Sequence, residues 1–472
     1  MSTAPGTPFI DPAAIVVRPP ATDDEIATFF RLTAAQFIHG APLDVAAADL
    51  RRYVYDAPAA DPGGVRGVFH GDLCLGGYLI DERWLRIGTA LLRAGCVGVV
   101  VAHPEHRGHG IGKALMRDSF DYARARGHTL LMLHGAPAYY QPFGYADVFD
   151  ATEHEVRRAD VLAHPSSPYR VRDATATDAE DMLDLYDRHF GPHPGSFDHT
   201  VDQEAFLLRF SDSLDPHAYP QRDGLPFAPT VIAVDADDRP RGYLASPWAL
   251  LRAFGSEVAA DDWPATLALL QHHARLLDEL DEPPEQVRWP LPPDSLAAEL
   301  LADHFTVQSL RHSRPSANWE ASLVDPTALT SGMVPAWQER WLRHRVAWSG
   351  RLALTIDGVT QVLSISPAGV SLDPVHQDVE ESVSFTGTVA LPLLFGFRSV
   401  EWAVSQEGQR IPQHLLPVLD VLFPPLTPWI AARDGSLRAV RKSCHPEELA
   451  RRISAPYRSR GRQTRFFACS SE

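Results

Sequence analysis

The alternation of apolar and polar positions predicts two similar stretches in distant parts of the chain. A Val-Arg pair at 17–18 is typical of a short strand, and Ala-Thr-Asp at 21–23 precedes an apolar pattern of helical spacing that runs to Leu32. The same order occurs between residues 171 and 185. Because Thr and Asp are favoured helix N-caps, each stretch predicts a strand, a turn and a helix.

A second pair of matching segments supports an internal repeat. Gly-Tyr-Leu at 77–79 and Gly-Tyr-Leu at 242–244 each lie in a strand-like stretch, at nearly the same separation as the first pair. Repetition at a constant separation indicates related structural units. We therefore expect two related domains in tandem.

The pattern changes again after Gly350. Apolar and polar residues alternate between turn signals there, as in antiparallel strands, and residues 390–397 and 414–423 predict short helices on that sheet. Together with Pro-rich joints, these patterns predict an α+β chain. Its expected parts are a first domain over 1–158, a related domain over 159–318, a third domain over 319–435 and a tail over 436–472.

Composition and charge narrow the class of protein. The 472 residues carry a formal net charge of −17, with 45% hydrophobic and 22% charged residues, which is typical of a globular protein and argues against general binding to nucleic acid or anionic membranes. The tail is an exception, with nine Arg or Lys against three Glu. It either folds back on the acidic body or recruits a partner.

The chain start and the cysteines indicate a cytosolic protein. Four cysteines without CxxC spacing fit neither a zinc site nor a disulfide framework. The first residues lack the basic and apolar regions of a signal peptide, and no apolar run is long enough to span a bilayer. We expect a cytoplasmic location and no metal.

The segment that carries chemistry is a glycine-rich turn after a buried strand. Val97–Ala102 predicts the strand, and Arg-Gly-His-Gly-Ile-Gly at 107–112 precedes a helix that runs to Arg126. Glycines at a helix N-terminus let backbone N–H groups converge, where the helix dipole also favours an anion. Neither a Walker ending nor GxGxxG spacing is present. A pyrophosphate is the expected guest, with Arg107 adding charge.

The turn resembles motif A of the GCN5-related N-acetyltransferases, R/Q-x-x-G-x-G/A after a strand. It stands here as Arg107-x-x-Gly110-x-Gly112, and a second family motif follows as Tyr140-x-x-Phe143-Gly144-Tyr145. The resemblance covers about residues 14–150. It implies a GNAT acetyltransferase domain that binds acetyl-CoA.

The resemblance also implies roles for individual residues. The backbone of Val100, Val101 and Ala102 would hold the acetyl and pantetheine arm. The pyrophosphate would bind Arg107 and the amides of the turn, which are those of Gly108, His109, Gly110, Ile111, Gly112 and Lys113. Tyr140 would protonate the departing CoA thiolate, a role that suits a phenol of pKa about 10; the alternative for Tyr140 is simple packing. His103, Glu105 and His134 lie near the motifs, but none of them is assigned as the general base.

The second domain lacks the glycine-rich turn. A helix there is expected to start near Asp261-Asp262, whose carboxylates would neutralise the dipole and repel a pyrophosphate. An active acetyltransferase domain, a degenerate copy and a sterol-carrier-protein-like third domain resemble the Eis (enhanced intracellular survival) type. That resemblance implies a homo-oligomer, a hexamer. In the Eis type the C-terminal carboxylate enters the active site and acts as the base. Here the chain ends at Glu472 after the basic tail, so that role is not carried over to this residue.

Two functions follow from these patterns. The first is an acetyl-CoA-dependent N-acetyltransferase acting by direct attack on a primary amine, such as an aminoglycoside-like compound, a polyamine or a lysine side chain. An acidic body suits a cationic acceptor. The second is an acetyl-CoA-sensing or apolar-ligand-binding protein with little transferase turnover.

Overall fold

A computed structural model describes residues 10–434, except for 38–41, 57–60, 136–138, 200–220, 223–224, 227–229, 246–255, 281, 313–318, 345, 375–378 and 433. The described residues fall into two compact units. Unit 1 contains those up to Ile80 together with Gly98–Ser119, and unit 2 contains Asp81–Val97 and those from Phe120 onward. The predicted basic tail, 436–472, lies outside the described residues.

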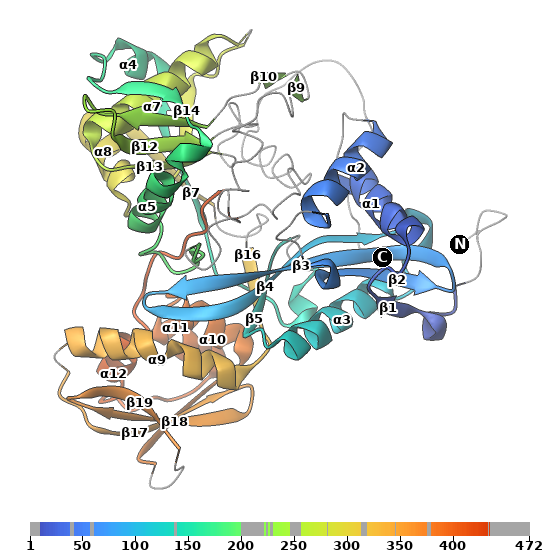
Figure 1. The fold of residues 1–472 in the computed structure, drawn as a ribbon. Helices are drawn as coiled ribbons and strands as arrows, with labels where there is room; N and C mark the ends of the chain where they lie inside the picture. Colours follow the sequence, from blue (N-terminus) through green and yellow to red (C-terminus); the bar gives the residue numbers. More distant parts are fainter. Residues whose placement is uncertain are drawn as a thin grey trace. The chain divides into compact units, whose positions relative to one another are not determined.

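Unit 1 contains the strands and helices that the first repeated stretch predicted. Its elements are β1 (Val16–Arg18), α1 (Asp23–Phe37), α2 (Leu43–Val54), β2 (Val65–His70), the first part of β3 (Leu73–Ile87), the last part of β4 (Ala90–Ala102) and the start of α3 (Ile111–Arg126). β2 pairs antiparallel with both β1 and β3. In Figure 1, α1 and α2 lie over one face of these strands and α3 over the other.

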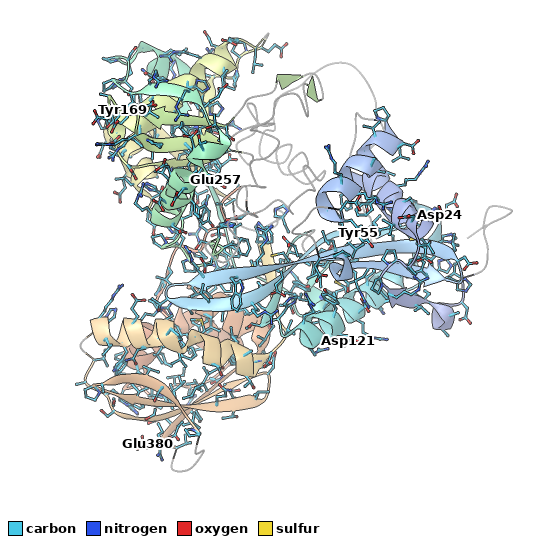
Figure 2. The ribbon with its side chains drawn as sticks, viewed as in Figure 1. Asp24, Tyr55, Asp121, Tyr169, Glu257 and Glu380 are labelled. Carbon is cyan, nitrogen blue, oxygen red and sulfur yellow. The ribbon has the colours of Figure 1, made fainter. Side chains whose placement is uncertain are left out.

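The core of unit 1 follows from the apolar spacing of α1. Ile26, Phe29 and Phe30 are all buried, and the rings of Phe30 and Tyr55 pack edge-to-face with centroids 6.1 Å apart. Tyr55, which follows α2, is labelled in Figure 2. Burying one such apolar side chain contributes about 2 kcal/mol. This buried face, more than intrinsic helix propensity, holds α1 in place.

Unit 2 contains the rest of the first sheet. Its strands are β5 (Leu130–His134), β6 (Ala146–Asp147) and β16 (Trp319–Leu323), and the sheet order is β1-β2-β3-β4-β5-β16-β6. β5 runs parallel to β4 over Ala94–Cys96, whereas β16 pairs antiparallel with both β5 and β6. The sheet of the first domain is therefore completed by a strand from far along the chain.

The second repeated stretch folds with the strand order of the first. Its sheet, in the order β13-β12-β11-β8, is formed by β8 (Arg170–Asp173), β11 (Val231–Val234), β12 (Pro240–Ala245) and β13 (Glu257–Ala260). The helices α5 (Ala179–His189) and α7 (Trp263–Asp278) follow β8 and β13, as α1 and α3 follow β1 and β4. The internal repeat that the sequence predicted is confirmed.

A salt bridge is repeated along with the topology. Arg18, at the end of β1, contacts Glu25 in the first turn of α1 at 2.7 Å. Arg172, in β8, contacts Asp178 just before α5 at 2.8 Å. Each arginine therefore ties the opening strand of its copy to the helix that follows.

Two strands cross the predicted domain limits. β7 (Ala151–Arg157), before the limit at 158, pairs with β14 (Gln286–Pro290) and β15 (Val307–His312) of the second copy. β16 follows the limit at 318, yet it pairs within the first sheet. The remaining elements of this region are α4 (Arg158–Ala163), β9 (Gln221–Arg222), β10 (Leu225–Pro226) and α8 (Leu296–His304). The domain limits remain a prediction that follows chain order.

The third region has the α+β texture that the sequence predicted. Its elements are α9 (Pro326–Arg343), β17 (Gly350–Ile356), β18 (Val359–Ser366), β19 (Gly369–Asp373), β20 (Glu381–Phe385), α10 (Gly387–Leu394), α11 (Val400–Glu407) and α12 (Leu416–Leu422). The sheet order is β19-β18-β17-β20, and β20 runs parallel to β17, where antiparallel pairing was expected. The difference arises because β20 joins the far edge of the sheet, beside β17 and away from its chain neighbour β19.

The last described residues pack against the second copy. Trp429 and Ala431, a few residues before the expected end of the third domain at 435, belong to one buried cluster with Tyr186 of α5. The Asp434 carboxylate accepts a hydrogen bond from the Tyr186 hydroxyl at 2.5 Å and lies 2.9 Å from His199 Nε2.

Among the described helices, none has both the length and the apolar character that a membrane crossing requires.

Candidate functional site

The end of β4 is distorted at one residue. Val99 is buried and has a φ of 46°, in the left-handed region that β-branched residues rarely adopt. Beyond it, Val101 is buried, whereas Val100 and Ala102 are half-buried. The residue pairs between β4 and β5 end at Cys96, so Val100–Ala102 lie past that pairing.

The glycine-rich turn before α3 is open. Gly108 and Gly110 have φ values of 85° and 80°, and a β-carbon built on either would meet no atom of the described residues within 4 Å. The space beside both backbones is therefore free for a ligand, and the left-handed conformation explains the glycines. No acidic side chain lies in the first turn of α3, so the positive end of this helix is not neutralised from within that turn.

The side chains of the turn combine exposed cations with one buried histidine. Arg107 and Lys113 are exposed, and the Arg107 guanidinium donates to Gln36 Oε1 at 3.1 Å. His109 Nδ1 lies 3.0 Å from the His106 carbonyl oxygen, which holds its ring against the turn. Burial lowers the pKa of His106, so this ring favours the neutral state.

An ion pair anchors α3 to the sheet behind the turn. Arg66 of β2 makes a bidentate contact with Asp118 of α3, at 2.6 and 2.8 Å, and the Tyr78 hydroxyl of β3 donates to the same carboxylate at 2.6 Å. Burial, then the Asp118 carboxylate, raises the pKa of Tyr78, so the phenol keeps its proton and acts as a donor. These contacts fix the helix whose N-terminus forms the turn.

Tyr140 lies in unit 2, in a short loop between β5 and β6. Its ring is half-buried and meets Tyr139 edge-on at 4.8 Å and Tyr145 at 5.8 Å between centroids. The Tyr140 carbonyl accepts from the Phe143 amide at 2.9 Å, and Gly144, with a φ of 88°, ends the turn. The loop therefore holds Tyr140 by packing and by backbone hydrogen bonds.

The candidate bases have structural contacts of their own. His103 Nδ1 accepts from the Glu105 amide at 3.4 Å, and the Glu105 side chain is exposed. The His134 ring lies 5.9 Å from that of Trp319 on β16. None of these contacts assigns a general base. Within the described part of the chain, no three His, Cys, Asp or Glu side chains are grouped to hold a metal ion.

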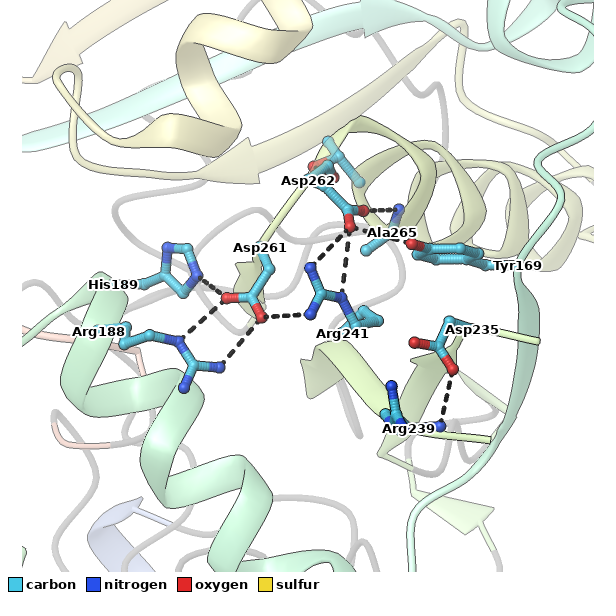
Figure 3. Close-up of polar contacts among 10 residues, drawn as sticks. Tyr169, Arg188, His189, Asp235, Arg239, Arg241, Asp261, Asp262 and Ala265 are labelled. Carbon is cyan, nitrogen blue, oxygen red and sulfur yellow. Dashed lines mark hydrogen bonds and ion pairs between the residues drawn. The ribbon is translucent and has the colours of Figure 1, made fainter. Parts of the chain in front are cut away.

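The equivalent helix end in the second copy is closed (Figure 3). Asp262 caps α7 by accepting from the Ala265 amide at 2.9 Å, and it also accepts from Arg241 and Tyr169, both at 3.1 Å. Asp261 is held by Arg188 at 3.1 Å and by His189 at 3.0 Å. The two carboxylates that the sequence singled out therefore occupy the place an anion would need.

The sequence singled out the consecutive residues of the candidate site and not those that meet through strand pairing. The predicted residues of β4 and the turn lie together in unit 1, because they are consecutive in the chain. Tyr145 was named only as the last residue of the second motif, without a role, and Glu320 was not named, although both are buried near Tyr140 in unit 2. Glu320 carries no local signal, since it reaches the first sheet only through β16.

These features lie within a region that matches a family of acyltransferases. Residues 18–148 match the model of the acetyltransferase (GNAT) domain, so this part of the chain is a GNAT domain, and that family binds acetyl-CoA or another acyl-CoA. No curated relative matches the chain by sequence.

Three solved structures share the fold over most of the chain. A GCN5-related N-acetyltransferase from Anabaena variabilis is 13% identical, with a TM-score of 0.63, and the match covers 88% of this chain and 99% of that one. One from Kribbella flavida is 19% identical, with a TM-score of 0.61 and coverage of 88% and 97%. Eis1 from Mycobacterium abscessus is 16% identical, with a TM-score of 0.56 and coverage of 88% and 99%. The chain therefore has the tandem GNAT fold with a further α+β domain.

Proposed function

We propose that this protein is an acetyl-CoA-dependent N-acetyltransferase that transfers the acetyl group to a primary amine by direct attack in a ternary complex. The observation that carries the proposal is the open turn at the start of α3, where no described atom lies within 4 Å of a β-carbon built on Gly108 or Gly110 and the first helical turn has no acidic residue. Backbone amides from Gly108 to Lys113 suit a pyrophosphate, and Arg107 adds charge beside them.

The distorted end of β4 supports the rest of the cofactor. Val100, Val101 and Ala102 lie past the last residue pair between β4 and β5. Backbone groups on that edge of β4 can hydrogen-bond the amides of a pantetheine arm. The same backbone donors would polarise the acetyl carbonyl as it becomes tetrahedral. CoA supplies the activated thioester; the protein binds and orients it.

Tyr140 is the proposed proton donor to the CoA thiolate. The support is the family motif in the sequence and a half-buried phenol held by the turn at Gly144. Its O–H bond breaks as the S–H bond of CoA forms. The acceptor amine loses its proton to a base that is not assigned.

The acceptor proposed is a small cationic amine, aminoglycoside-like or a polyamine, or a lysine side chain. The support is the acidic composition, with a net charge of −17 over the whole chain, which enriches cations near the surface. The same proposal includes a cytoplasmic location, a sterol-carrier-like third domain and a homo-oligomer, a hexamer by its resemblance to the Eis type. Light scattering of the purified full chain tests the last of these.

The decisive experiment is Tyr140→Phe with a panel of amines. Loss of the donor is expected to lower kcat by about a hundredfold or more, with the Kd of acetyl-CoA, measured by calorimetry, unchanged within about twofold. The matched control is Tyr139→Phe, which alters the neighbouring exposed phenol and leaves kcat near that of the wild type. An undiminished kcat in Tyr140→Phe removes the tyrosine from this role. Binding of acetyl-CoA without turnover on any amine would instead favour an acetyl-CoA-sensing protein.

A further inference from the structure

The ring of Tyr140 lies on one defined face of the first sheet. A β-carbon built on Gly135 would stand 2.2 Å from Tyr140 Cε2 and 2.9 Å from Leu133 Cδ1. The ring therefore occupies the space that a side chain at 135 would fill, on the face to which Leu133 points. Since side chains alternate along a strand, residues 133 and 135 share that face.

β16 adds a carboxylate to this face. Glu320 is paired in register with Leu133 of β5 on one side and with Asp147 of β6 on the other. Residues directly opposite in an antiparallel pair have their side chains on the same face, with β-carbons about 5 Å apart. Glu320 is 1% exposed, so its carboxyl group is buried on this face of the sheet.

The far end of the loop also rests on β16. A β-carbon at Gly144 would lie 3.3 Å from the Ser322 hydroxyl oxygen, and Ser322 shares the face of Glu320 because it is two residues further along the strand. Tyr145, which follows Gly144, is 2% exposed and packs against the Tyr140 ring. Both ends of the loop thus contact the face from which Glu320 projects.

Tyr145 lies close enough to both Tyr140 and Glu320 to be affected by their charges. The described residues give its buried hydroxyl no hydrogen-bond partner. Burial, then Tyr140, then Glu320 raises the pKa of Tyr145 well above its usual value, so both neighbours act on one phenol. The other titratable groups around this cluster are Tyr139 in the loop, His134 on β5 and Asp147 on β6.

We propose that Glu320 is a positioning residue for the proposed proton donor, whose buried carboxylate keeps Tyr140 in the protonated state between turnovers. The inference rests on the proposed function of Tyr140. When Tyr140 gives its proton to the CoA sulfur, its phenolate faces a fixed negative charge, which favours return of a proton from solvent to the same oxygen. Glu320 thus restores the donor, and it does not itself take part in the transfer.

The test is the pH dependence of kcat in the full chain, for wild type, Glu320→Gln and Glu320→Asp. Removing the negative charge lowers the proton affinity of Tyr140, so the alkaline limb of the Glu320→Gln profile is expected to move to lower pH by about one unit. Glu320→Asp keeps the charge but withdraws it by one methylene, and a smaller shift in the same direction is expected. This second variant keeps the proposal testable if Glu320→Gln does not fold.

A matched control exists in the second copy. Glu257, labelled in Figure 2, is also 1% exposed and accepts a hydrogen bond from the buried Tyr243 hydroxyl at 2.7 Å. Glu257→Gln changes an equally buried glutamate in a tyrosine contact far along the chain from Tyr140, so it is expected to lower stability without moving the alkaline limb. A shift of equal size in Glu257→Gln would overturn the assignment to Glu320.

A second readout separates this inference from the proposed function. The phenolate absorbance of Tyr140, taken as the difference between each protein and its Tyr140→Phe form, titrates without any turnover. An alkaline step that moves to lower pH in Glu320→Gln supports the inference even if no amine is acetylated. If Tyr140→Phe lowers kcat but the profiles and phenolate steps of wild type and Glu320→Gln coincide, the positioning role fails and the proposed function stands.

Discussion

The N-termini of α3 and α7 occupy equivalent places in two copies of one topology, yet the residues around them differ. The turn before α3 has two left-handed glycines with open space beside them and no acidic residue in the first turn of the helix. The turn before α7 has Asp261 and Asp262, both satisfied by arginines. A shared fold therefore leaves anion binding to be decided by a few residues at one helix end.

The largest expected effect comes from making the first helix end resemble the second. Gly110→Asp places a carboxylate in the open turn, where it repels a pyrophosphate and occupies its space. We expect the affinity for acetyl-CoA to fall about a hundredfold, or about 3 kcal/mol, by calorimetry.

Its control is Gly408→Asp in the third domain. Gly408 has a φ of 61° and equally open surroundings, so the variant carries the same backbone strain away from the turn. If Gly408→Asp leaves the affinity for acetyl-CoA unchanged and Gly110→Asp lowers it, the effect comes from the turn before α3. Equal losses in the two variants would contradict the comparison.

A smaller effect is expected from opening the second helix end. Asp262→Ala removes the cap on Ala265 and a partner of Arg241, and its expected cost is about 1 kcal/mol in the free energy of unfolding. Chemical denaturation measures this cost. We also expect no new acetyl-CoA site, because Asp261 remains and no glycine turn is present. A second molar equivalent of bound acetyl-CoA in this variant would show that the cap alone closed the copy.

The smallest effect concerns the salt bridge that both copies repeat. The Arg18 side chain, then the Ala21 amide, lowers the pKa of Glu25 to about 2. Because the folded-state value lies below the unfolded one, this stabilisation is complete above pH 4.5 and is lost as the pH falls towards 2. Glu25→Gln is expected to cost about 0.5 kcal/mol at neutral pH, since the pair is partly exposed. Denaturation curves of variant and wild type that stay apart at the acid end would contradict this assignment.

How much of the site the sequence predicted depends on distance along the chain. The turn from Arg107 to Lys113 and the carboxylates at 261–262 were visible because a helix end is defined by consecutive residues. The left-handed φ of Val99 was not visible, since nothing local requires it of a valine. The position of Glu320 could not be predicted from the sequence, because Glu320 pairs with Leu133 and the whole second copy lies between them in the chain.

The fold shows the same limit. Strand and helix positions in the first domain followed from local periodicity, and α3 ends at Arg126 as expected. The exchange of β7 and β16 did not follow, because each strand has an ordinary alternating pattern that could pair at many edges. Strand partners are chosen by packing of whole faces, which a local pattern does not record.

The position of β16 in the sheet determines when the first domain can finish folding during translation. β6 has no partner on its inner side until Leu323 has been synthesised and released, although β6 itself is complete at Asp147. Until then the edge of β5, which is apolar from Leu130 to Leu133, also stays unpaired on the side that β16 covers, and such an edge promotes aggregation or chaperone binding. The enzyme therefore matures late in translation, and a gene fragment that ends after the first domain would encode an unfinished sheet.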